Sequence, residues 1–111
     1  LGALAGCAHV DVVVVNAHPD WRVRDLGLRG CDWPEVLEPG EATPVGTCLL
    51  GEGPLTFLKQ DLDPPEDALF DWFPYRTEAS ILLTRGTGPV EVELGPDGLM
   101  QDFDRDGPRS H

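Results

Sequence analysis

The sequence predicts an all-β protein, an antiparallel β-sandwich, and three observations support this fold class. Short segments that are rich in β-branched residues, or that alternate apolar with polar residues, recur along the chain. Turn-forming residues separate them at intervals of about 8–12 residues. No segment of about 12 or more residues combines an apolar stripe at helical spacing with capping residues. With 111 residues, 41% of them hydrophobic, the chain is the size of one domain with its own core.

The first half of the chain contains four predicted strand segments, at 9–15, 21–24, 26–29 and 43–50. The first is rich in valine, which is typical of a buried strand. The second and third segments each show strand-like alternation, but the two patterns are one residue out of phase with each other. A β-bulge is therefore expected at Asp25 between them. Turns or loops are expected at 16–20, 30–34, 38–41 and 51–54.

The second half supplies strands at 55–58, 80–84, 90–94 and 99–103, and an aromatic-rich segment at 68–75. Seven to eight strands in total favour an immunoglobulin-like sandwich. The chain is predicted to consist of an N-terminal segment (1–7), the sandwich domain (8–103) and an acidic tail (104–111). Glu91 and Glu93 are expected on a wet face. The predicted core positions are Val12, Val14, Val23, Leu82 and Val92.

The charge balance narrows the classes of partner. There are 20 acidic against 8 basic residues, a net charge of −12, and Lys59 is the single lysine. Such a surface repels phosphate backbones and anionic lipid, so a nucleic-acid partner is not expected. A cationic protein, a divalent metal or a neutral glycan is compatible with it. No stretch of about 18 apolar residues is present to span a membrane.

The N-terminal residues Leu4-Ala5-Gly6-Cys7 resemble the lipobox of bacterial lipoproteins. The resemblance implies that Cys7 carries lipid, becomes the mature N-terminus and anchors the domain on the outside of the cytoplasmic membrane. Ala8 after the cysteine resembles the outer-membrane sorting pattern. The alternative is a short apolar segment with a buried cysteine, because only six residues precede Cys7 and none of them is basic.

If Cys7 is lipidated, Cys31 and Cys48 remain as an even pair. A bridge between them closes a loop of about 17 residues and is expected to contribute roughly 3 kcal/mol to stability. Exported compartments permit such a bond. The alternative, two separate buried thiols, stays open because spacing does not fix geometry.

Asp102, Asp104 and Asp106, followed by Gly107, resemble the opening of EF-hand-like and dockerin-like calcium loops. Alternating carboxylates converge on the ion there, while glycine permits the sharp bend. The closing acid of a full loop is missing, so any calcium site is expected to be weak. The alternative is a solvated acidic tail, and no other cofactor is predicted.

Residues 12–20 (VVVVNAHPD) resemble the start of zinc-dependent N-acetylglucosamine deacetylases. The resemblance implies His18 as a zinc ligand and Asp20 as a general base. However, the second Asp of that motif is Trp21 here, and the distant His pair of the family is missing. Zinc catalysis needs three protein ligands and an open position. A turn that ends the valine strand is therefore favoured.

The function predicted from sequence is a non-enzymatic, extracytoplasmic lipoprotein domain that binds a partner or takes part in assembly at the cell envelope. One alternative is a calcium-stabilised adhesion or glycan-binding module, in which Trp21, Trp33 and Trp72 would offer aromatic faces to sugar rings. The deacetylase-like enzyme ranks below both.

Overall fold

The computed structural model describes residues 9–63, 72–86 and 89–102, and its described part consists of strands, turns and loops. No helix there is long and apolar enough to cross a membrane. The strands are β1 (His9–Asn16), β2 (Trp21–Leu28), β3 (Cys31–Trp33), β4 (Gly46–Leu49), β5 (Gly51–Gly53), β6 (Thr56–Asp61), β7 (Phe73–Thr77), β8 (Ile81–Leu83), β9 (Val90–Leu94) and β10 (Leu99–Gln101).

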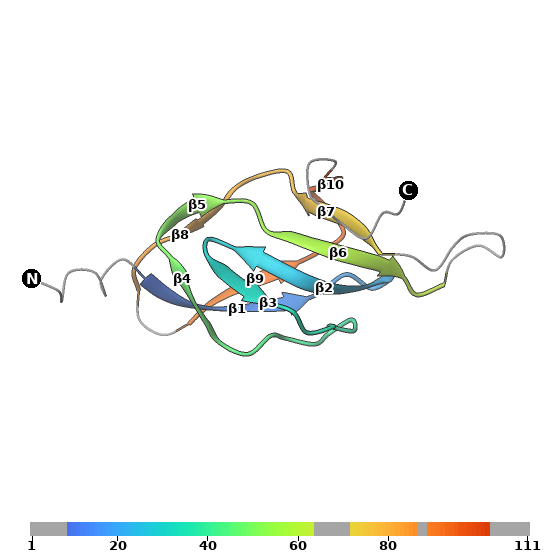
Figure 1. Ribbon diagram of the computed structural model, residues 1–111, viewed down its shortest axis with the longest axis horizontal. Helices are drawn as coiled ribbons and strands as arrows, with labels where there is room; N and C mark the ends of the chain where they lie inside the picture. The colour runs from blue at the N-terminus through green and yellow to red at the C-terminus, as the bar shows by residue number, and fades with distance from the viewer. Residues whose placement is uncertain (1–8, 64–71, 87–88, 103–111) are drawn as a thin grey trace, which may run out of the picture.

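These strands form three sheets (Figure 1). Sheet A has the order β4-β1-β9, sheet B the order β10-β7-β6-β2-β3, and the small sheet C pairs β5 with β8. In the view of Figure 1, β1 and β9 run behind β2 and β3, so that sheets A and B form two layers. The prediction of an all-β fold with antiparallel sheets packed as a sandwich is confirmed.

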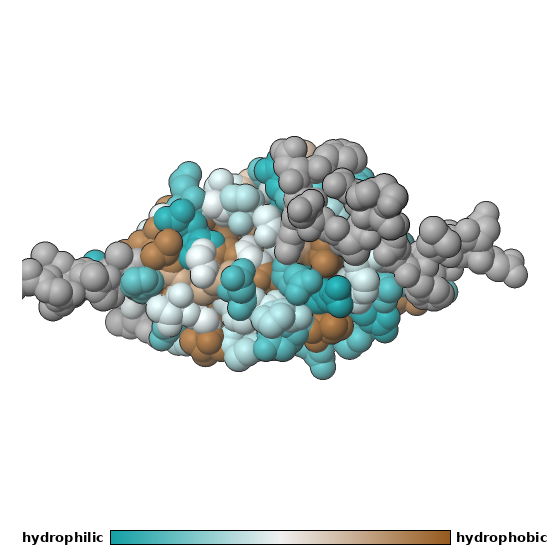
Figure 2. Space-filling view, in the orientation of Figure 1, coloured by the Kyte–Doolittle hydropathy of each residue, from teal (hydrophilic) through white to brown (hydrophobic). Residues whose placement is uncertain are grey.

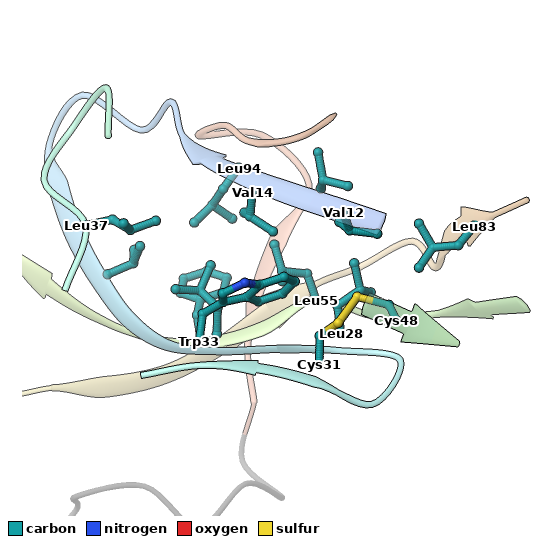
Figure 3. Close-up of a cluster of buried hydrophobic side chains, with 14 of the residues drawn as sticks. Val12, Val14, Leu28, Cys31, Trp33, Leu37, Cys48, Leu55, Leu83 and Leu94 are labelled. Atoms are coloured by element: carbon teal, nitrogen blue, oxygen red, sulfur yellow. A yellow bond between two sulfur atoms is a disulfide. The ribbon is translucent and has the colours of Figure 1, made fainter. Parts of the chain in front are cut away.

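The core lies between sheets A and B. Figure 3 shows Val12, Val14 and Leu94 pointing from sheet A toward Trp33 and Leu28 of sheet B. All five are buried, as are Phe57 and Leu55 of the same hydrophobic cluster. The Trp33 Nε1–H donates a hydrogen bond to the Pro44 carbonyl at 2.9 Å, which ties β3 to the segment leading into β4. Gly46 completes this contact, because a Cβ there would lie 2.7 Å from the Trp33 ring.

Strand alternation sorts the residues of sheet A between its two faces. Val12, Val14 and Val92 are buried, whereas Glu91 and Glu93 are exposed, as predicted. Val13 and Val15 alternate with the buried residues of β1; they face outward and are half-buried.

The bulge predicted at Asp25 is present in β2. Pairing with β6 shifts register between Arg24 and Gly27, and Asp25 has a left-handed φ of 52°. Aspartate tolerates this conformation better than most side chains. The bulge restores the inward orientation of Leu26 and Leu28, and Val23 before it is also buried.

Leu82 is wrong as a core position. It is 62% exposed, whereas its neighbour Leu83 is 1% exposed and belongs to the core. Ile81, Leu82 and Leu83 are three consecutive apolar residues, so their sequence does not show which of the two faces of β8 is buried.

Three further features differ from the sequence prediction. Residues 31–33 and 51–53 form the strands β3 and β5 where loop and turn were expected. β1 pairs with β9 in parallel, although every other strand pair is antiparallel among the described residues. The immunoglobulin-like arrangement is not confirmed: its first two strands share one sheet, whereas here β1 and β2 lie in different sheets.

Candidate functional site

The described residues bring a lysine, a histidine, an aspartate and aromatic rings together at one end of sheet B. We call His18, Trp21, Lys59, Asp61 and Tyr75 the Lys59 cluster. Strand pairing sets Trp21 opposite Asp61 and Lys59 opposite Val23, on the face that continues the core. Lys59 is consequently only 8% exposed.

Lys59 contacts one carboxylate and three aromatic rings. Its Nζ is 2.9 Å from the Asp61 carboxylate and 4.6 Å from the centre of the Trp21 ring. The Tyr75 and Phe73 rings each lie 5.5 Å from the same ammonium. A buried cation needs such partners to offset its lost hydration. At this end of the sheet, the Lys59 ammonium is therefore packed among aromatic rings, while its ion-pair partner Asp61 stays partly exposed.

His18 is held in the turn between β1 and β2. Its ring stacks on Trp21 at 4.1 Å and 7°, and its Nδ1 accepts a hydrogen bond from the Asp20 backbone N–H at 3.1 Å. The backbone N–H of His18 donates a hydrogen bond to the side-chain oxygen of Asn16. The Asn16 amide in turn donates to the carbonyls of Trp21 and Leu37, at 2.9 and 3.1 Å.

This geometry gives the His18 ring a structural task. The Nδ1 of His18 is occupied by the Asp20 N–H, and Trp21 stands where the deacetylase motif has its second carboxylate. No group of three or more His, Cys, Asp and Glu side chains suited to a metal occurs among the described residues. In the described part of the chain, the motif therefore acts as a strand-ending turn.

A small pocket of about 250 Å³ opens beside the Lys59 cluster. Asp20, Asp61, Leu62 and Asp63 line it. Its volume lies below the roughly 300–1,000 Å³ of typical small-molecule sites. A second pocket, of about 280 Å³, lies at the bulge between Asp25 and Asp32. Its lining combines Asp25 and Asp32 with Leu26, Trp33 and Pro34, and its volume is likewise below that range.

Burial lowers the pKa of His18 below its ordinary value of 6.5. The nearby Lys59 charge acts in the same direction, while Asp20 and Asp61 oppose it. Neutral His18 accepts a hydrogen bond at Nδ1, and protonation would convert that acceptor into a donor facing another donor. The unfolded chain therefore takes up this proton at higher pH than the folded chain.

We expect the free energy of unfolding to fall as the pH drops below about 6.5, with the His18 contribution fully present above that pH. Urea unfolding at neutral and mildly acidic pH measures this loss of stability. The loss should be smaller in His18→Gln than in the wild type, and it should be unaltered in His9→Gln because His9 is exposed. Equal pH dependence in wild type and His18→Gln would contradict the assignment.

Cys31 and Cys48 form a disulfide, with Cα atoms 5.1 Å apart, within the usual range for such a bond. Cys31 belongs to β3 of sheet B and Cys48 to β4 of sheet A, so the bridge joins the two layers. Both residues are buried in the core beside Leu28 (Figure 3). The structure thus contains the predicted disulfide rather than two separate buried thiols.

The other predicted site residues are only partly described. Asp102 is buried, its N–H donates to the Pro74 carbonyl, and its carboxylate lies 3.8 Å from the Arg76 guanidinium. A cation at Asp102 would have to compete with that guanidinium. Asp104, Asp106 and Cys7 lie outside the described residues, so the calcium loop and the lipid anchor stay predictions.

The tryptophans differ in accessibility. Trp33 is 3% exposed and Trp21 is covered by His18 and Lys59, so neither presents a free face to a sugar. Trp72 is half-buried, with the Arg24 guanidinium 4.8 Å above its ring.

Sequence reasoning missed Asn16 and the role of Lys59. Asn16 is fully buried, and its side chain makes three hydrogen bonds that hold the turn. A polar residue directly after a valine strand was the available signal. For Lys59 the signal was a lone lysine directly after the apolar pair Phe57-Leu58, but its aromatic partners come from two other strands, β2 and β7. No family model, curated protein or solved structure matches this chain.

Proposed function

We propose that this chain is a non-enzymatic domain of a lipid-anchored protein, located outside the cytoplasm of a bacterium, where it binds a partner in the cell envelope. The observation that carries the proposal is the buried Cys31–Cys48 bridge between the two sheets. Such bonds persist in oxidising compartments and are rare in the cytosol. The lipobox-like residues Leu4-Ala5-Gly6-Cys7 supply the means of attachment.

The arrangement of reactive side chains supports a binding role. Lys59 and Asp61 form an ion pair with each other, while His18 stacks on Trp21 and accepts a hydrogen bond from the Asp20 backbone. Side chains that already have such partners within the protein stabilise the turn and the sheet, which favours a structural role over a catalytic one. The outward face of sheet A, in contrast, combines exposed acids with half-buried valines, which suits contact with another molecule.

The anchor is tested by expressing the full-length precursor in a bacterium and analysing it by mass spectrometry. We expect Cys7 to be the first residue of the mature protein and to carry acyl chains, with the protein in the membrane fraction. The Cys7→Ser variant should lose the lipid and the membrane association while it keeps the Cys31–Cys48 bridge. An uncleaved, cytosolic wild-type chain with unmodified Cys7 would overturn the proposal.

A further inference from the structure

The outward face of sheet A is apolar along its centre. We call Asp11, Val13, Val15, Val45, Glu91 and Glu93 the sheet A face. β1 is the central strand of this sheet, and its valines continue without interruption from Val12 to Val15. A strand with one wet face usually alternates with polar residues, whereas an unbroken apolar run is typical of burial on both faces. Val45, beside this strand, is 56% exposed.

Acids flank this apolar centre. Strand pairing sets Glu91 beside Val13 and Glu93 beside Val15. Asp11 lies further along β1, where its carboxylate accepts a hydrogen bond from the Thr47 hydroxyl at 3.2 Å. Neither glutamate takes part in an ion pair within the described residues. Their charges face solvent without local neutralisation.

The basic residues of the described strands lie in the other layer. The strands β1, β4 and β9 contain no lysine or arginine. Arg22, Arg24 and Arg76 belong to β2 and β7 of sheet B, where Glu38, Asp25 and Asp102 pair with them. Figure 2 shows the side of the molecule over β2, β3 and β6, where hydrophilic residues separate small hydrophobic patches. The two layers thus differ in the charge that their strands carry.

We infer that the sheet A face binds a partner protein that presents lysine or arginine next to apolar side chains. This inference rests on the proposed binding role and names its surface. The valines supply apolar area to bury, and the unpaired carboxylates select a cationic rim. A second copy of this chain, with its net charge of −12, would bring like charges together. Anionic lipid and nucleic acid are repelled in the same way.

The test uses the purified, oxidised 111-residue chain and a short synthetic peptide in which valine and lysine alternate, separated by serines. In an extended peptide this spacing places valine and lysine on the same face. We expect NMR shift changes at the Val13, Val15 and Val45 methyls and at the Glu91 and Glu93 amides. The same peptide with glutamate in place of lysine should not bind.

Matched variants distinguish binding at the sheet A face from attraction of the peptide to the overall negative charge. Glu91→Gln/Glu93→Gln should weaken peptide binding about fivefold at low salt, which corresponds to about 1 kcal/mol for the two exposed ion pairs together. Glu35→Gln/Glu52→Gln removes the same charge from exposed positions outside sheet A and should change affinity less than about twofold. Val15→Thr should also weaken binding, whereas Val36→Thr, at a 44% exposed loop position, should not.

The inference is overturned if the peptide does not bind, if its shift changes map elsewhere, or if both glutamine pairs weaken binding equally. Sedimentation that shows a dimer broken by Val15→Thr would assign the face to a second copy and also overturn it. These outcomes are independent of the lipid on Cys7. A lipidated protein that fails the peptide test would therefore refute the surface and leave the anchor standing.

Discussion

Replacing both Cys31 and Cys48 with alanine is expected to lower the free energy of unfolding by about 3 kcal/mol. The bridge spans 17 residues, and a closed loop of this size restricts the unfolded chain by roughly that amount. Both sulfurs are also buried, so their removal takes contacts from the core. Urea unfolding of the wild type and the double variant measures the difference.

Two comparisons make this result specific to the bridge. Adding a reductant should destabilise the wild type to a similar extent and leave the double variant unchanged. The Cys7→Ser variant should unfold like the wild type, because the third cysteine takes no part in the bond. A wild type insensitive to reduction would show that the bridge adds little to stability.

Leu83→Ala is expected to cost about 2–5 kcal/mol of unfolding free energy, whereas Leu82→Ala should stay within about 0.5 kcal/mol. Leu83 is 1% exposed and packs in the core, so alanine leaves a cavity there. Leu82, its direct neighbour, is 62% exposed. The same substitution at adjacent positions thus reports which face of β8 is buried.

Thermal and urea unfolding of the two single variants provide the measurement. A larger loss for Leu82→Ala would mean that β8 pairs with β5 one residue out of register, because such a slip exchanges the two faces of a strand. Equal losses would mean that β8 is buried on both faces. Either result would contradict the described packing.

The sequence was informative where alternation or a change of phase was clear. Val12, Val14, Val23 and Val92 were correctly predicted in the core, and the bulge at Asp25 follows from two alternating segments that disagree by one residue. β8 failed because three consecutive apolar residues carry no alternation. β3 was missed because it is only three residues long and lies between Gly30 and Pro34.

The candidate site was harder to predict because its contacts are non-local. The cysteine pair could be proposed by counting, since three cysteines leave two when one is assigned to the lipobox. The Lys59 cluster could not, because its members come from the β1–β2 turn, β2, β6 and β7. Local patterns identify strands, but the order of strands in the sheets decides which side chains meet.

The parallel pairing of β1 with β9 has a consequence for how the chain acquires its structure. Sheet A combines residues 9–16, 46–49 and 90–94, so its central strand lacks one neighbour until nearly the whole chain is available. Contacts between such distant segments slow folding and prolong the exposure of unpaired strand edges. During this interval the valine-rich strand β1 has an unpaired edge that can associate with other chains. A chain that crosses a membrane before it folds would need a chaperone to shield that strand until β9 arrives.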